Sequence, residues 1–113
     1  MKKPDAVAVL GALAQDSRLD VFRLLVEAGR QGMPAGHIAA SLKLPPSALT
    51  FHLDRLREAG LVTVTRDGRS MIYAARFDTM NALMSYLTDQ CCQGRPELCV
   101  PAAKPARRRE KVR

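Results

Sequence analysis

The chain has 113 residues, of which 47% are hydrophobic, and its formal net charge is +7. This length suits one domain with a small core. Because the sequence has no run of about 18 apolar residues and no secretory signal, we expect a soluble, cytoplasmic protein without membrane contact. Three cysteines, an odd number, favour metal or redox chemistry over a disulfide framework.

The positive charge is concentrated near the C-terminus. Residues 101–113 hold six basic side chains against Glu110, a net charge of +5, which leaves +2 for the rest of the chain. Because such tails are usually solvated, we expect this one to add nonspecific affinity for phosphates at most. A DNA-binding role must therefore rest on the architecture of the domain.

Two helices are predicted first. Residues 5–14 are apolar almost all the way round, which in a short helix favours burial on several sides, as at a subunit interface. The second helix is expected to start with a capping box formed by Ser17 and Asp20 and to stop at Gly29.

A helix-turn-helix is predicted next. Pro34 can occupy the first turn of a short helix, and Pro46 suits the first position of a longer helix that ends near Gly60. The apolar side chains at helical spacing are Ile38 and Leu42 in the first helix and Leu49, Leu53 and Leu56 in the second. The second helix of such a motif can lie in the major groove of DNA.

Two β-prone runs, residues 61–66 and 69–74, flank Asp67-Gly68, a pair that favours a two-residue hairpin turn. With this loop Arg66 faces Arg69 at the tip, an unfavourable pairing unless an anion such as a DNA phosphate lies beside it. The further predicted pairs are Val64 with Met71 and Val62 with Tyr73. The hairpin is therefore interpreted as a DNA-contacting wing.

The last predicted helix runs from a cap at Asp78 to about Gln90. Its apolar stripe consists of Met80, Leu83, Met84 and Leu87. The stripe can be core or a dimer surface, and the sequence leaves both open. Together with residues 5–14, this helix can form a layer between two subunits.

The order helix, helix, helix-turn-helix, hairpin, helix resembles the ArsR/SmtB family of metal-responsive repressors over roughly residues 5–92. The resemblance is carried by LPPSALTFHLDRLREAGLV (44–62), AQDSRLDVFRLLVEAG (14–29) and RDGRSMIYAA (66–75). It implies a mainly α, winged helix-turn-helix homodimer that represses genes from an imperfect inverted repeat in double-stranded operator DNA. We expect residues 1–92 to form this domain and 93–113 to be a flexible segment with Cys99 and the basic tail.

The resemblance also implies particular DNA contacts. By position these are Ser47, Ala48, Thr50, Phe51, His52 and Arg55 in the recognition helix and Arg66 and Arg69 in the wing. Pro45 stands where relatives often have a serine cap, and Phe51 where a polar residue is common; phenylalanine can contact a thymine methyl but offers no hydrogen bond. For His52, DNA contact and packing both stay open, whereas His37 is interpreted as a surface or packing residue.

Cys91, Cys92 and Cys99 are the most informative residues chemically. Trivalent arsenic accepts three thiolates in a pyramid, whereas structural zinc takes four ligands, and no histidine follows His52 to complete such a set. The placement resembles that in arsenic sensors of the family with cysteines at and beyond the end of the last helix. It implies As(III), and also Sb(III), as the inducer, with no organic cofactor.

Several alternatives stay open. The cysteines can be a chance cluster or a thiol redox switch. The chain can also be an arsenite-binding protein without a DNA switch, or an architectural DNA-binding protein without a ligand switch. An enzyme is not expected, because no nucleophile with a partner base and no paired carboxylate site occurs. A thiol reductase does not fit cysteines that lead into a proline-rich tail rather than a preorganised pocket.

Overall fold

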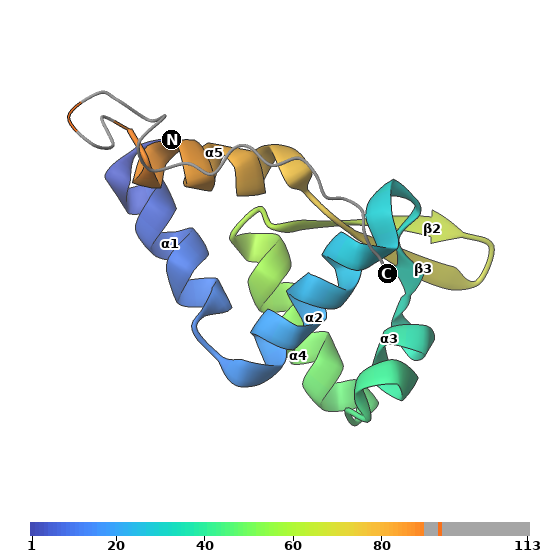
Figure 1. The fold of residues 1–113 in the computed structure, drawn as a ribbon. Helices are drawn as coiled ribbons and strands as arrows, with labels where there is room; N and C mark the ends of the chain where they lie inside the picture. Colours follow the sequence, from blue (N-terminus) through green and yellow to red (C-terminus); the bar gives the residue numbers. More distant parts are fainter. Residues whose placement is uncertain (90–92, 94–113) are drawn as a thin grey trace.

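The computed structural model of the chain describes residues 1–89 and 93. The elements, in order, are α1 (Lys3–Leu13), α2 (Asp16–Ala28), a 3₁₀ turn (Gly29–Gln31), β1 (Met33–Pro34), α3 (Ala35–Leu42), α4 (Pro46–Glu58), β2 (Val62–Asp67), β3 (Ser70–Ala75) and α5 (Phe77–Leu87) (Figure 1). This order confirms the mainly α, winged helix-turn-helix fold. The predicted boundary between residues 1–92 and 93–113, all three cysteines and the basic tail lie outside the described residues and stay predictions.

The start of α2 corrects one prediction. The helix begins at Asp16, and the side chain of Gln15 caps it by accepting a hydrogen bond of 2.8 Å from the backbone N–H of Arg18. The capping box of Ser17 and Asp20 is wrong, because Ser17 already lies within the first turn. Glutamine is a less common cap, so the sequence pointed to the serine instead.

The helix-turn-helix forms largely as predicted. α4 starts with Pro46 at its first position and is capped at its C-terminal end by Ala59. Pro34, in contrast, lies just before α3 and not in its first turn, because its backbone is extended with ψ 147°. The extended residues Met33–Pro34 instead form a short strand, β1, which the sequence analysis missed.

The sheet is antiparallel in the order β1-β3-β2. Its hairpin register differs from the predicted one: Arg66 pairs with Met71 and Val64 with Tyr73. The loop is Gly68-Arg69, and of these two only Gly68 has a positive φ, 64°, as a type II′ turn requires. The predicted Asp67-Gly68 turn needs positive φ at both residues, which Asp67 does not adopt.

Gly32 brings the chain unusually close to β3. Its φ of 72° is open to glycine, and a Cβ at this position would collide with the carbonyl oxygen of Tyr73. β1 follows directly and pairs Met33 with Tyr73. Glycine therefore permits the third strand to join the hairpin.

The start of α5 also corrects a prediction. Its N-cap is Arg76, and Asp78 lies inside the first turn, where its carboxylate accepts a 2.8 Å hydrogen bond from Arg76. In the stripe of this helix Leu83 is buried, whereas Met84 and Leu87 are exposed by 57% and 55%. Within the described residues, the stripe thus contributes Leu83 to the core and leaves Met84 and Leu87 exposed.

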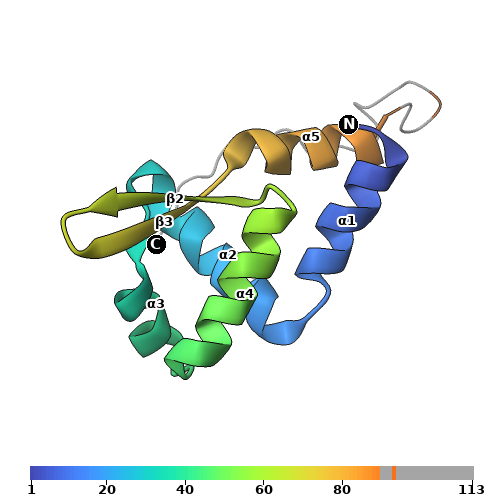
Figure 2. The ribbon, with the colours of Figure 1, turned by 180° about the vertical axis from the view of Figure 1, so that it is seen from behind.

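The core lies where α2, α3 and α4 meet the base of the sheet. Its fully buried larger side chains are Val21, Leu25, Ile38, Leu53, Leu56, Leu61 and Val62. α1 and α5 form one end of the molecule, and the hairpin extends at the other (Figures 1 and 2). In the part of the chain that the structure describes, no helix is both long and apolar enough to cross a membrane.

Candidate nucleic-acid interface

The face of α4 opposite its leucine stripe is the candidate DNA-reading surface. Leu49, Leu53 and Leu56 anchor the other face in the core, each exposed by 2% or less. The predicted contact residues on the outer face are Ser47, Thr50, Phe51 and Arg55, which are exposed, and Ala48 and His52, which are half-buried. The structure thus brings all six predicted residues of the recognition helix to the accessible side of α4 or its margin.

Phe51 is the largest exposed apolar side chain on this surface, with 54% of its area accessible. The guanidinium of Arg55 lies 5.2 Å from the centre of its ring, and that of Arg18 lies 6.0 Å from it. Both distances are in the range of cation–π attraction. Phe51 therefore presents an apolar surface for a thymine methyl with two cations beside it.

His52 lies at the margin of the same surface. Its ring packs edge-on against Phe51, with the ring centres 5.8 Å apart, and its Nδ1 lies 3.5 Å from a guanidinium nitrogen of Arg18. Partial burial lowers the pKa of His52 below its usual value, and the positive charge of Arg18 lowers it further. Both effects favour the neutral imidazole.

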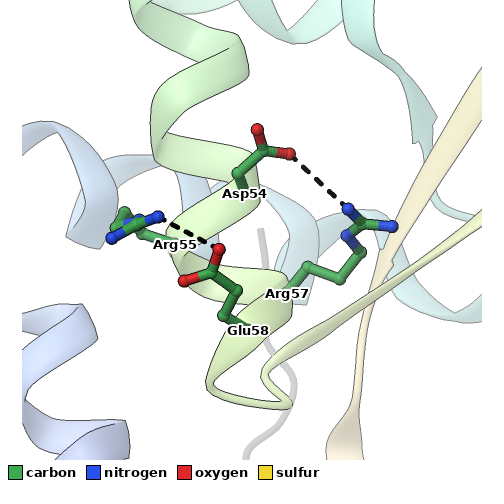
Figure 3. Close-up of polar contacts among 4 residues, drawn as sticks. All are labelled: Asp54, Arg55, Arg57 and Glu58. Atoms are coloured by element: carbon green, nitrogen blue, oxygen red, sulfur yellow. Dashed lines mark hydrogen bonds and ion pairs between the residues drawn. The ribbon is translucent and has the colours of Figure 1, made fainter.

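Two ion pairs flank the last turns of α4 (Figure 3). Arg55 lies 3.0 Å from Glu58, and Arg57 lies 3.8 Å from Asp54, each pair three residues apart in the sequence. All four side chains are exposed, so each pair adds little to stability. Their effect is to compensate the positive charges of Arg55 and Arg57 on the helix itself.

The wing exposes Arg66 and Arg69, as predicted, but they do not face each other. Arg66 donates a hydrogen bond of 3.1 Å from Nε to the carbonyl of Gly68, and Arg69 belongs to the turn itself. The anion that the predicted pairing required is therefore not needed. Both arginines remain accessible cations at the tip of the hairpin.

Arg18 belongs to this surface although the sequence analysis did not single it out. It lies on α2, and its partners Phe51 and His52 follow more than thirty residues later. No local spacing reveals such a contact. Within residues 1–89 and 93, no three histidine, cysteine, aspartate or glutamate side chains are grouped as metal ligands, and the predicted ligands Cys91, Cys92 and Cys99 lie outside that part of the chain.

A helix-turn-helix with an exposed second helix and a basic hairpin defines a winged-helix DNA-binding protein. The family model of a helix-turn-helix domain matches residues 13–65. The chain is 31% identical to the HTH-type transcriptional regulator YgaV of Escherichia coli over 77% of this chain and 86% of that protein. It is 30% identical to the transcriptional activator HlyU of Vibrio cholerae, over 78% and 79%.

A third relative is the putative arsenical resistance operon repressor ArsR of Halobacterium salinarum, 38% identical over 56% of this chain and 48% of that protein. Among solved structures, an ArsR-like transcriptional regulator from Rhodococcus sp. RHA1 superposes with a TM-score of 0.70 at 25% identity, over 84% of this chain and 87% of that one. The chain belongs to the ArsR/SmtB family of winged-helix transcriptional regulators. It is a DNA-binding regulator and not an enzyme.

Proposed function

We propose that the chain represses an arsenic-resistance operon and leaves its operator when As(III), or Sb(III), binds the thiols of Cys91, Cys92 and Cys99. The observation that supports the DNA-binding part of this proposal is the exposed face of α4. There Phe51 lies within 6.0 Å of two guanidiniums, and the buried leucine stripe anchors the opposite face of the helix. Such a face is suited to the major groove, where methyl groups and hydrogen-bond acceptors identify the bases.

The proposed assembly is a homodimer. Val7 and Leu10 on α1 and Met84 and Leu87 on α5 are each exposed by 43% or more, an unusual concentration of apolar surface at one end of a small domain. Covering that end with a second copy would present two recognition helices and two wings to an imperfect inverted repeat. Because the operator is cellular DNA, the proposal places the protein in the cytoplasm.

The inducer is inferred from the donor set. Trivalent arsenic and antimony bind soft sulfur ligands, and three thiolates complete their coordination. Structural zinc takes four ligands, so three thiolates would leave its coordination incomplete. The first cysteine follows the last residue of α5, Leu87, by four positions. Binding would therefore occur next to one of the proposed dimer helices. The name of the Halobacterium salinarum relative supports the same assignment.

The test is a fluorescence-anisotropy titration of the reduced protein on its own upstream DNA and on a scrambled duplex. Arsenite, antimonite, zinc, cadmium and a thiol oxidant are then added one at a time. We expect preference for the upstream DNA and release by arsenite or antimonite, with a loss of affinity of roughly tenfold or more, about 1.4 kcal/mol of coupling.

The matched variant replaces all three cysteines by serine. It should bind the operator as the natural chain does but stay bound when arsenite is added. Release of this variant by arsenite would refute the cysteine site. Release of the natural chain by the oxidant and not by arsenite would mean that the cysteines form a redox switch and not an arsenic sensor. Equal affinity for both duplexes would show that the upstream DNA holds no operator for this protein.

The sign of regulation needs a reporter in cells, because one relative is named an activator. A promoter fused to the upstream DNA should be silent with the protein alone and expressed when arsenite is added. Expression that depends on the protein without arsenite would make this chain an activator.

A further inference from the structure

Arg18, in the first turn of α2, joins three helices through one guanidinium. Its Nε donates a 2.7 Å hydrogen bond to the carbonyl of Ala12, near the end of α1. One terminal nitrogen lies 3.5 Å from Nδ1 of His52 on α4, and the group also lies 6.0 Å from the ring centre of Phe51. Arg18 is half-buried, so its position is set by these neighbours.

The contact with His52 has a defined direction. A guanidinium carries five N–H donors, has no acceptor and is not deprotonated in proteins. The hydrogen between Arg18 and His52 must therefore come from Arg18, and Nδ1 of the imidazole must accept it. A neutral imidazole has a single N–H, so in this arrangement the hydrogen is on Nε2.

The other ring nitrogen, Nε2, determines what His52 can offer to DNA. Among the residues that the structure describes, Nε2 makes no hydrogen bond to a protein group, and part of the His52 side chain is accessible. The edge-on packing against Phe51, at an interplanar angle of 65°, restrains the ring orientation. Burial and the charge of Arg18 lower the pKa of His52 and so favour the neutral ring. A neutral ring agrees with this tautomer.

We propose that Arg18 is a positioning residue of the DNA-reading surface, which holds His52 in the Nε2–H form and so makes it a hydrogen-bond donor to a base. This inference rests on the proposed function, in which α4 lies in the major groove. A donor there fits N7 of a purine and O6 of guanine, whereas the other tautomer would offer an acceptor and fit the amino groups of adenine or cytosine. Arg18 would thereby help to select the operator sequence without touching it.

The tautomer can be measured without DNA, by the ¹⁵N chemical shifts of the His52 ring. The natural chain should show its hydrogen on Nε2. Arg18→Lys keeps the charge but removes the fork that reaches Ala12 and His52 together, so it should give a mixture of tautomers. Arg23→Lys makes the same change at an exposed position of the same helix and should leave the ring signals unchanged. A hydrogen on Nδ1 in the natural chain would overturn the proposal.

The consequence for DNA binding is tested with a double-mutant cycle. Arg18→Lys should weaken operator binding roughly 3- to 10-fold, the value of one hydrogen bond, and change binding to scrambled DNA much less. In a His52→Gln background the same substitution should have almost no effect, because an amide offers a donor without any tautomer to fix. An equal loss in both backgrounds would show that Arg18 acts on DNA or on folding directly.

The base partner is probed with operators in which single purines are replaced by their 7-deaza analogues, which lack the N7 acceptor. One such position should weaken binding of the natural chain and leave the His52→Ala variant unaffected. If the effects of the two changes were additive at every position, His52 would not contact a base at N7. A contact between His52 and a phosphate would give that result. If the natural chain showed no operator preference at all, the proposed function would fail, while the ring signals would still decide the tautomer.

Discussion

His52 lies on α4 at the margin between the core and the exposed face, and its pKa is below the usual value of 6.5 because of partial burial and the charge of Arg18. An unfolded chain therefore takes up a proton at this residue at a higher pH than the folded chain does. The stability contributed by the neutral ring is complete above about pH 6.5 and is lost as the pH falls through the lowered, folded-state pKa.

We expect an NMR titration to place the pKa of His52 below 6.5. Arg18→Met should raise it only in part, because burial is the larger cause. In urea unfolding the natural chain should lose more stability between about pH 7.5 and 5 than His52→Gln does. A pKa at or above its usual value in the natural chain, or complete restoration by Arg18→Met, would contradict this account.

The neighbours of Phe51 show which side-chain contacts a sequence can reveal. Arg55 follows Phe51 by four residues, so the helical repeat alone places them on one face. Arg18 reaches the same ring only because α2 and α4 pack together in the finished fold. The exposed position of Phe51 was thus predictable, and the second cation beside it was not.

α4 was predicted almost residue by residue because separate signals agree. Pro46 marks its start, three leucines mark one face, and Ala59-Gly60 marks its end. At the start of α2 the propensity of serine indicated Ser17 as the cap, whereas the structure uses the less common cap Gln15. β1 has two residues, Met33–Pro34, which is too short to show any alternation.

The hairpin was predicted with the right strands and the wrong pairing. Moving the loop from Asp67-Gly68 to Gly68-Arg69 shifts each partner by two residues, so the same side chains still share a face. Apolar pattern cannot separate these two registers. The backbone angle of Gly68 decides between them, and it is not visible in the sequence.

The close approach at Gly32 gives a test of the third strand. Gly29 and Gly32 have nearly the same backbone, with φ and ψ of 78° and −162° and of 72° and −161°. A Cβ at Gly29 meets nothing within 4 Å, whereas at Gly32 it meets the backbone of Tyr73. The two glycines therefore differ in their surroundings and hardly at all in conformation.

Gly29→Ala should lower the free energy of unfolding by about 1–3 kcal/mol, the cost of placing a side chain in this backbone region. Gly32→Ala should lower it by at least a further 1 kcal/mol or so, because β1 must move away from β3. Urea unfolding of the two variants gives the difference. Equal losses would mean that the approach to Tyr73 does not constrain the chain.

α1 and α5 lie at the end of the molecule away from the hairpin tip (Figures 1 and 2), and both helices carry exposed apolar side chains. The sequence predicted an apolar α1 and left the role of the α5 stripe open between core and dimer surface. The structure divides that stripe, with Leu83 buried and Met84 and Leu87 open. Within residues 1–89 and 93, Met84 and Leu87 stay exposed.

Met84→Glu should therefore convert a dimer to monomers in analytical ultracentrifugation and weaken operator binding, since two linked recognition helices bind an inverted repeat together. Met71→Glu is the matched control, because Met71 is also an exposed methionine, at 42%, but lies on the wing. It should leave the sedimentation unchanged. A dimer that survives Met84→Glu would place the subunit contact elsewhere.

The paired charges of α4 bear on how the protein finds its site. Asp54 and Glu58 balance Arg55 and Arg57, so the recognition helix carries no net charge. Affinity for arbitrary DNA rises with the number of phosphates that cations neutralise, and α4 contributes little to it. We therefore expect α4 to add little to the residence time on incorrect sequences and to prolong binding only where the bases themselves fit the helix.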